Sequence, residues 1–547
     1  MRHRLFVVAV LSALVSITGI RAQRPAPSAA RAGAPSVIKL DRFDRSPRLR
    51  DLPPGTPPIG EMVKEREPRW RRVSRHPSGL LSDPVVQASP QVPTIPGPSR
   101  NVEGIGNVNA VLPPDTSGDV GPNHFVQWVN LSFAVYSKGT ATTPPALLYG
   151  PAAANTLWSG FGGPCETRND GDPIVRYDHL ADRWVMSQLA VPNNLFGILL
   201  FGPFYECIAV SATPDPLGAY YRYQYSFDKL NDYPKLAVWP DGYYMSINQY
   251  TALSLQWAGQ GVVAFDRAKM LAGQPAAAMY YDLASTDMNL GGMLPADLDG
   301  PAPPAGAPAY FVEMDDDAWG YAPSDQLQLW QFHSDWTTPS QSSFTRVAVL
   351  PTAPFDSDMC GNARNCLPQP GTTTTVDAMS DRLLYRLQYR NFGDYEAMVV
   401  THTVDVDGTD HAGLRWYEIR NPGSSPSIYQ QGTYAPDSNH RWMGSVALDS
   451  AGNLALGFSV TGPSTFPSIR YTGRLATDPP NVMTLGESDL MVGTGSQTNT
   501  SGRWGDYSSM VVDPVDDCTF WYTQEYYANS GAFDFKTRIV SFRLPGC

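Results

Sequence analysis

The segment Asp506-Tyr-Ser-Ser-Met-Val-Val-Asp-Pro-Val-Asp-Asp-Cys-Thr-Phe-Trp521 decides the fold. It opens with an aspartate, continues through an apolar run from Met510 to Val512, turns at Asp513 and Pro514, and ends in aromatic residues. Apolar and aromatic runs separated by Asp and Pro are typical of β-strands joined by a turn. The segment therefore predicts an antiparallel hairpin with an aspartate at its start.

The same plan recurs upstream. The clearest copies are Asp172-Pro-Ile-Val-Arg-Tyr-Asp-His-Leu-Ala-Asp-Arg-Trp184 and Asp232-Tyr-Pro-Lys-Leu-Ala-Val-Trp-Pro-Asp-Gly-Tyr-Tyr244. Seven copies lead at positions 119, 172, 232, 297, 377, 443 and 506, at intervals of 53 to 80 residues. Such spacing indicates a repeat architecture, and each unit is long enough for four strands. We therefore predict an all-β fold, a seven-bladed β-propeller over residues 100–547. A β-sandwich pair and a β-helix are the alternatives.

Two segments precede the repeats. Residues 1–22 have a basic start and an apolar stretch from Leu5 to Leu14, which is the pattern of a secretory signal peptide. That stretch is too short to span a bilayer. Residues 23–99 are rich in Pro, Arg, Ala and Ser and bury too little apolar surface to fold alone, so we predict a disordered leader or pro-segment. We expect a secreted or periplasmic protein without a membrane span.

Charge is divided along the chain. Residues 1–75 contain 16 Lys and Arg against 6 Asp and Glu, which leaves 24 against 46 for the remainder. The two parts therefore carry formal charges of +10 and −22. A body this acidic is a poor ligand for phosphate backbones, which bind through Lys and Arg. Nucleic acid is therefore excluded as the expected partner.

The six cysteines indicate disulfides in an exported chain. Other connectivities remain open from the spacing alone. A repeat array favours links between neighbours, namely Cys165 with Cys207, Cys360 with Cys366, and Cys518 with Cys547.

An acidic ring is expected at the mouth of the central channel, where the innermost strand of each blade begins. Six copies place an aspartate at or beside that point, and the seventh offers Arg441 and Trp442. Three explanations remain open: acid, base or nucleophile in glycoside cleavage, ligands of Ca²⁺, or caps of turns. The six aspartates are Asp119, Asp172, Asp232, Asp297, Asp377 and Asp506.

The candidate catalytic residues are Asp506, Glu525, Asp172 and Glu313. Glu313 and Glu525 have strongly apolar neighbours in sequence. Burial raises the pKa of a carboxyl group toward neutrality, which suits a general acid. A hydrogen-bonded structural role is the alternative for each glutamate.

Aromatic and cationic residues near the same strand ends are candidate substrate-binding groups. Aromatic faces stack on the apolar faces of sugars, and arginines make bidentate contacts with carboxylates. Packing between blades is the alternative for each aromatic residue. These candidates are Arg441, Trp442, Arg503, Trp504, Tyr507 and Arg390.

One acidic run is a candidate cation site. Asp315 and Asp317 are candidate ligands for Ca²⁺, a cation that prefers six to eight oxygens. No other cofactor is expected. Signatures of metalloproteases, serine hydrolases and P-loop proteins do not occur in the sequence.

Two segments carry a family resemblance. Arg503-Trp-Gly-Asp-Tyr-Ser with Asp513-Pro-Val-Asp-Asp-Cys-Thr-Phe-Trp-Tyr522, together with Pro113-Pro-Asp-Thr-Ser-Gly-Asp-Val-Gly-Pro122, resembles a group of exported bacterial β-propeller proteins over most of residues 105–547. The resemblance implies fold and export but no reaction. A more distant likeness is to sialidase-like propellers, of whose Asp-box turns only the fragment Asp449-Ser-Ala-Gly-Asn453 is present. Their arginine triad has no secure match in Arg390, Arg441 and Arg503.

The leading functional hypothesis is a secreted carbohydrate-active protein, a glycoside hydrolase acting at the channel mouth. The rival is a non-catalytic extracellular binding or adhesion propeller that Ca²⁺ stabilises. In both cases we expect an extracellular glycan or cell-surface ligand as partner, and a monomer.

Overall fold

The computed structural model describes residues 30–38, 40–57, 62–63, 82–92, 94–140, 142–195, 199–361 and 363–547. The predicted signal peptide, residues 1–22, lies outside them. The two α-helices are short, α1 (Pro164–Thr167) and α2 (Arg267–Leu271), and strands form most of the regular structure. The all-β prediction is confirmed. No helix in these ranges is long and apolar enough to cross a membrane. The 3-10 turns are η1 (Leu49–Asp51), η2 (Ala154–Trp158), η3 (Leu283–Ser285), η4 (Asp317–Trp319) and η5 (Pro339–Gln341).

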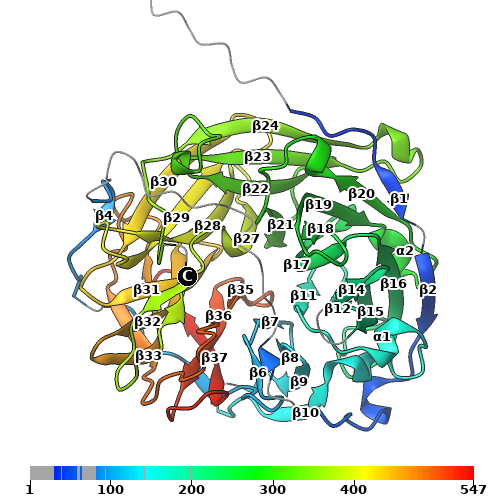
Figure 1. Ribbon diagram of the computed structural model, residues 1–547, viewed down its shortest axis with the longest axis horizontal. Coiled ribbons are helices and arrows are strands. Elements are labelled where there is room, and N and C mark those ends of the chain that lie inside the picture. Colours follow the sequence, from blue (N-terminus) through cyan, green and yellow to red (C-terminus); the bar gives the residue numbers. More distant parts are fainter. Residues whose placement is uncertain are drawn as a thin grey trace, which may run out of the picture.

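Most strands form antiparallel groups that follow one another around a common centre (Figure 1). The first groups are β7 (Thr116–Val120), β8 (His124–Val129), β9 (Ser132–Ser137) and β10 (Leu147–Ala153); then β11 (Ile174–Asp178), β12 (Arg183–Ala190), β15 (Phe204–Ser211) and β16 (Tyr220–Phe227); then β17 (Leu230–Trp239), β18 (Gly242–Tyr250), β19 (Trp257–Phe265) and β20 (Ala278–Asp282).

The next groups complete the circle. They are β21 (Leu294–Asp299), β22 (Ala309–Asp315), β23 (Gln326–His333) and β24 (Ser343–Pro351); then β27 (Leu384–Asn391), β28 (Glu396–Asp405), β29 (Ala412–Arg420) and β30 (Ser427–Tyr434); then β31 (His440–Leu448), β32 (Leu454–Gly462), β33 (Thr465–Arg474) and β34 (Glu487–Met491); and finally β35 (Ser509–Val512), β36 (Thr519–Tyr527) and β37 (Phe535–Arg543). Short pairs outside the groups are β3 (Met62–Val63) with β6 (Val111–Leu112), β13 (Asn193–Leu195) with β14 (Leu199–Phe201), and β25 (Asn365–Leu367) with β26 (Val376–Asp377).

The first strands of the groups form the inner ring. Each first strand contacts the first strand of the next group, and β35 contacts β7. The propeller prediction is confirmed. The groups are not all separate sheets, because β21 pairs in parallel with β27 and joins two groups into one nine-stranded sheet. The number of seven blades therefore stays a prediction.

Second strands such as β18 and β32 are covered on both faces by neighbouring groups. Every residue of β18 and of β32 is buried. A strand buried on both faces reads as a continuous apolar run rather than as an alternating one. This is why the sequence shows hairpins of apolar and aromatic residues without a strict period of two.

The predicted leader is partly ordered on the outer rim. β5 (Arg100–Glu103), which begins just after the predicted leader, pairs with β37. Within the leader, β1 (Ser36–Ile38) pairs with β20, β2 (Leu40–Arg45) with β16, and β4 (Val86–Gln87) with β30. The prediction of disorder is therefore wrong for these stretches. An outer strand has unpaired N–H and C=O groups along its free edge, and the leader strands pair with them.

The two ends of the propeller differ in their connections. Because the strands of a group are antiparallel, the segments between groups lie at the same end as the turns between second and third strands. We call this the loop end, because it contains the long segments 154–173, 283–293, 352–383 and 492–508. The inner strands begin at the loop end, so it is the end that can present a site built on the axis.

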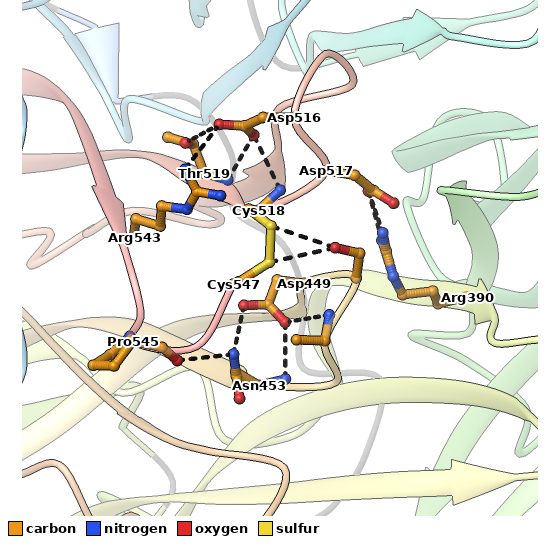
Figure 2. Close-up of a disulfide and its surroundings, with 12 residues drawn as sticks. Arg390, Asp449, Asn453, Asp516, Asp517, Cys518, Thr519, Arg543, Pro545 and Cys547 are labelled. Atoms are coloured by element: carbon orange, nitrogen blue, oxygen red, sulfur yellow. Dashed lines mark hydrogen bonds and ion pairs between the residues drawn. A yellow bond between two sulfur atoms is a disulfide. The ribbon is translucent and has the colours of Figure 1, made fainter.

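Three disulfides link neighbouring cysteines, Cys165 with Cys207, Cys360 with Cys366, and Cys518 with Cys547. The predicted pairing is confirmed. Figure 2 shows the last of them joining the chain terminus to the turn before β36. Ser450 Oγ lies 3.4 Å and 3.3 Å from the two sulfur atoms, so this link also contacts the turn of the preceding group.

Candidate functional site

The inner strands share a backbone feature at the loop end. At or just before each of them one residue has a positive φ, between 43° and 65°. Such φ values are costly for residues other than glycine and concentrate at functional sites. The predicted leading positions 172, 443 and 506 coincide with this feature, and the other four differ from it by one to five residues. The positions are Asp115, Asp172, Tyr233, Gly292, Met379, Met443 and Asp506.

The six predicted aspartates do not form one ring, because two of them lie deeper along the axis. Arg176 Nη1 lies 2.8 Å from Asp297 Oδ2 and 3.5 Å from Asp119 Oδ2. Arg386 lies 3.3 Å from Asp297 and also pairs with Asp299. Buried charges persist only when they are paired. Asp119 and Asp297 thus belong to an ion network that connects β7, β11, β21 and β27.

Asp506 lies in a second ion network at the loop end. Its carboxylate pairs with Arg503, and Arg503 Nε lies 3.8 Å from Asp377 Oδ2. Asp377 also pairs with Arg364 Nε at 2.9 Å. The four residues come from the long segments 352–383 and 492–508, so these segments are held together at the axis. The structure thereby brings together the predicted residues Asp506 and Arg503.

Glu525 lies next to this network on β36. It is fully buried, and its Oε1 accepts a hydrogen bond from the backbone N–H of Gly505. Burial raises the pKa of Glu525 well above its usual range, and the negative charge of Asp506 acts in the same direction. This environment favours the protonated, neutral form of Glu525, beside a carboxylate that is paired with an arginine.

A similar pair lies across the axis. Asp172 Oδ2 accepts a hydrogen bond of 3.1 Å from the backbone N–H of Tyr233. Glu206 is fully buried on β15 and accepts a hydrogen bond of 2.9 Å from Asn231 Nδ2. Burial raises the pKa of Glu206 well above its usual range, and the charge of Asp172 raises it further. Two buried glutamic acids with raised pKa values, each beside an aspartate, thus flank the axis.

Lys235 lies between the two pairs. Its ammonium group is 3.2 Å from the ring centroid of Tyr233 and 4.1 Å from that of Tyr507, and it donates to the carbonyl oxygen of Pro234 at 3.1 Å. Burial lowers the pKa of Lys235 to about 8, against the opposing effect of Asp172 and other carboxylates nearby. The loop end of the axis is thus a compact set of charged and aromatic groups.

The predicted aromatic residues pack in the interior. Tyr507 donates to the carbonyl oxygen of Pro173 at 2.9 Å, across the axis. Trp442 and Trp504 are fully buried, with ring centroids 5.6 Å apart, and Trp504 Nε1 donates to Ser459 Oγ at 3.1 Å. Tyr507 therefore belongs to the axial set, whereas the two tryptophans pack together beside it.

Two predicted arginines lie away from the axial set. Figure 2 shows Arg390 paired with Asp517, in the turn that precedes β36. Arg441 pairs with Asp437 at 2.8 Å and with Glu487, on the outer side of β31. It lines a pocket of about 300 Å³ whose other side contains leader residues. Neither arginine contacts Asp506 or Glu525.

The remaining predicted residues lie around the end of β22. Glu313 is buried, and its Oε1 accepts a hydrogen bond of 3.3 Å from the backbone N–H of Gly291. Asp315 accepts hydrogen bonds from the side chains of Gln326 and Gln328. Glu313 and Asp315 therefore lie in side-chain networks between strands.

Asp317 lies with two other carboxylates that could hold a metal ion, those of Asp316 and Asp325. Burial and the charge of Asp316 raise the pKa of Asp325 to about 7. The oxygens of Asp316 and Asp325 accept hydrogen bonds from backbone N–H groups, including those of Ala318 and Phe355. The bond between Asp316 and Ala318 is that of a turn cap, whereas the bond between Asp325 and Phe355 joins two distant segments.

Sequence reasoning missed Glu206 and Lys235. Glu206 is the single charged residue of β15, and Lys235 shares β17 with one other charged residue, Asp232; the other residues of both strands are mostly apolar or aromatic. A charged residue in such a run indicates a buried polar group, which must find partners in neighbouring strands. That signal was present in the sequence, but it did not say which residues would supply the partners.

Comparison with known proteins adds little to this geometry. No protein-family model matches the chain, and no curated protein matches it. Among solved structures, the chain is similar to the Penicillium chrysogenum α-L-arabinanase, at 9% identity over 73% of this chain and 98% of the other, with a TM-score of 0.32. It is also similar to the Trypanosoma rangeli sialidase, at 11% identity over 68% of this chain and 54% of the other, with a TM-score of 0.33. A PL25 ulvan lyase aligns at 10% identity over 81% of both chains, with a TM-score of 0.26. Likenesses this distant carry no argument about what the chain does.

Proposed function

We propose that the protein is a secreted carbohydrate-active protein, a glycoside hydrolase that acts at the loop end of the propeller axis. The observation that carries the proposal is the pairing of Glu525 with Asp506. The environment keeps Glu525 neutral, while Arg503 pairs with the carboxylate of Asp506. Two carboxyl groups with opposite protonation states are what acid and base roles in one site require.

The proposed chemistry follows from those two states. Glu525 donates its proton to the oxygen of the leaving sugar, and the carboxylate of Asp506 acts on the opposite side of the scissile bond. Asp506 either attacks the anomeric carbon or activates a water molecule that does so. Arg503 fixes the orientation of Asp506 through their ion pair. Asp172 with Glu206 is a second pair of the same kind.

A glycan must be able to reach the two carboxyl groups, which the structure shows closed off from solvent. Asp506 is 3% exposed and Glu525 is fully buried. A glycan therefore reaches them only when the segments 352–383 and 492–508 move apart. The ion pair of Asp377 with Arg503 and the hydrogen bonds between Gln369 and Gln497 are among the contacts that would have to open.

The test is cleavage of polysaccharides by the purified mature protein. Release of reducing ends would be measured on a panel of neutral and acidic polysaccharides, for the wild type and for Asp506→Asn and Glu525→Gln. We expect cleavage of at least one polymer and a loss of about 100-fold or more in each variant, the usual size of an acid or base contribution. Thermal denaturation of each variant shows that the loss is not unfolding. Cleavage at wild-type rates by both folded variants would refute the assignment.

A second candidate is a non-catalytic extracellular binding propeller. The observation in its favour is that the axial groups are hydrogen-bonded to one another across the axis. Tyr233 Oη donates to the carbonyl oxygen of Asp506 at 3.1 Å, and Tyr507 Oη donates to that of Pro173 at 2.9 Å. A rigid, closed axis suits a scaffold. Binding without cleavage on the same panel would favour this candidate.

A further inference from the structure

A groove on the outer rim is lined by uncharged polar and aliphatic side chains, and an exposed aromatic ring lies on the same strand as one of them. It has a volume of about 330 Å³, and its lining comes from leader strand β4 with the residue before it, from β30 and from the segment before β34. β4 pairs with β30 at the rim (Figure 1). We call it the rim groove. Its lining residues are Val85, Val86, Gln87, Gln431, Asn481 and Val482.

The carboxamides of the rim groove have a defined orientation. Gln431 Oε1 accepts from the backbone N–H of Ala353 at 2.9 Å, and Asn481 Oδ1 accepts from the backbone N–H of Gln431 at 3.0 Å. Since a backbone N–H can only donate, each amide oxygen faces the protein and each NH₂ group is left for another acceptor. Neither NH₂ group has a hydrogen bond within the described part of the chain. Two donors thus remain for oxygens of a ligand.

An exposed ring follows along the same strand. Tyr429 lies two residues before Gln431 on β30 and is 50% exposed. The guanidinium group of Arg420 lies 3.3 Å from its ring centroid, and Arg420 in turn lies over Tyr395 and pairs with Glu418 at 2.6 Å. A ring supported on one face loses little freedom when a ligand packs on the other.

We propose that the rim groove and Tyr429 form a binding subsite for neutral saccharide units, separate from the axial set. Hydroxyl and ring oxygens accept from the NH₂ groups of Gln431 and Asn481, and the apolar face of a sugar packs on Tyr429. The lining residues carry no charge. The chain beyond residue 75 has a formal charge of −22, which disfavours acidic polymers.

The leader forms one wall of this subsite. Gln87 Nε2 donates to the carbonyl oxygen of Met483 at 3.0 Å, and its Oε1 accepts from the N–H of Met483 at 2.9 Å. These bonds hold β4 against the segment that contributes Asn481. The inference takes its ligand class from the proposed function, but it rests on different residues.

The test is affinity electrophoresis of the full chain in native gels containing xylan, hydroxyethyl cellulose or galactomannan, with polygalacturonate as the acidic comparison. We expect at least one neutral polymer to retard the wild type. Tyr429→Ala and Gln431→Ala each weaken retardation by about tenfold in the dissociation constant, the effect of losing one good contact. Tyr429→Phe retains it, since the ring face and not the hydroxyl group makes the contact. The matched control is Tyr321→Ala, a residue 36% exposed on a different group, which leaves retardation unchanged.

The outcomes separate the subsite from the axial chemistry. Absence of retardation by every neutral polymer, stronger retardation by polygalacturonate, or wild-type retardation of Tyr429→Ala would overturn the subsite. Asp506→Asn serves as the second comparison. Neutral polymers should still retard this variant, because the rim groove is unchanged, whereas any cleavage should be lost. If the wild type cleaves polymers but Tyr429→Ala binds normally, only the subsite fails. If Tyr429→Ala loses binding and no polymer is cleaved, only the hydrolase assignment fails.

Discussion

Burial shifts the pKa values of Glu525 and Lys235, and both shifts can be tested without a substrate. The pKa of Glu525 is raised by burial and by Asp506, whereas burial lowers that of Lys235 to about 8. A pKa that differs between the folded and unfolded chain makes stability depend on pH. Each residue therefore has its own pH signature.

For Glu525 the signature lies in the acidic range. The folded chain keeps the proton to higher pH than the unfolded chain, so the stabilising effect is complete below the unfolded pKa of about 4.3 and is lost as pH rises. We expect wild type to lose stability relative to Glu525→Gln as pH rises above about 4.3, by up to ~1.4 kcal/mol per pH unit. Urea unfolding of both proteins at several pH values measures this. If the difference in unfolding free energy between the two proteins does not change with pH, the pKa of Glu525 is not raised in the folded chain.

For Lys235 the signature lies in the alkaline range and has the opposite sign. The folded chain releases the proton near pH 8 while the unfolded chain holds it until about 10.5, so wild type gains stability as pH rises between these values. Relative to Lys235→Met, the gain is up to ~1.4 kcal/mol per pH unit. Comparing the two proteins cancels the titration of the tyrosines. If the unfolding free energies of the two proteins change with pH in the same way from pH 7.5 to 10, the pKa of Lys235 is not lowered in the folded chain.

Sequence reasoning at this scale found Asp506, Arg503 and Tyr507 but missed their neighbours. An aspartate before a strand and an arginine close to it are visible in a short window of sequence. The partners Glu206 and Lys235 come from other groups, and only the ring brings them together. The predicted ring of six aspartates failed for a related reason, because strand patterns do not fix which residue adopts the positive φ at the loop end.

At the scale of elements, the leader strands are the largest departure from expectation. A composition rich in Pro and Arg cannot form its own core, which is why residues 23–99 were predicted to be disordered. The strands β1, β2 and β4 need no core, because each adds to an existing sheet edge. Composition describes a segment by itself and cannot show an edge supplied by the rest of the chain.

One ion pair tests whether the leader is held as the structure shows. Asp44 on β2 pairs with Arg222, which is 1% exposed, whereas Asp44 is 36% exposed. Removing the acid leaves a buried guanidinium group without its partner, so Asp44→Ala is expected to cost roughly 1–3 kcal/mol, less than a fully buried pair because Asp44 meets solvent. Limited proteolysis within residues 30–57 should become faster, and the unfolding free energy should fall.

The matched control is Asp51→Ala, which removes an exposed pair with Arg48 in the same leader. Solvent screens this exposed pair, so its loss should lower the unfolding free energy less than Asp44→Ala does. Equal effects of the two substitutions would show that β2 is not anchored through Arg222.

The circle of strand groups is closed by a strand from the beginning of the propeller sequence that pairs with a strand from its end. β5, at its beginning, pairs with β37, at its end, and the disulfide Cys518–Cys547 fixes the terminus beside them. The repeat spacing was enough to predict this circular arrangement. It did not predict that the last group borrows its outer strand from the start, since repeats in sequence do not reveal which strand pairs across the closure.

Removal of the terminal disulfide tests the closure. The disulfide bridges a sequence separation of 29 residues. In the chain-entropy account, a link of this length contributes roughly 3–4 kcal/mol. We expect the Cys518→Ser/Cys547→Ser double variant to unfold at lower urea concentration than wild type. Exchange of backbone amide hydrogens in β37 should rise first. Unchanged stability would mean that the β5–β37 pairing closes the ring without the disulfide.

The central claim is that Asp506 and Glu525 act on a glycan at the loop end of the axis, and one comparison tests it most directly. The rate of reducing-end release by Asp506→Asn is measured beside that of Asp489→Asn, an exposed aspartate on the outer rim. The account predicts that wild type and Asp489→Asn cleave the same polymer at similar rates, and that folded Asp506→Asn is slower by about 100-fold or more. Equal rates for the two variants, or no cleavage of any polymer by the wild type, would contradict it.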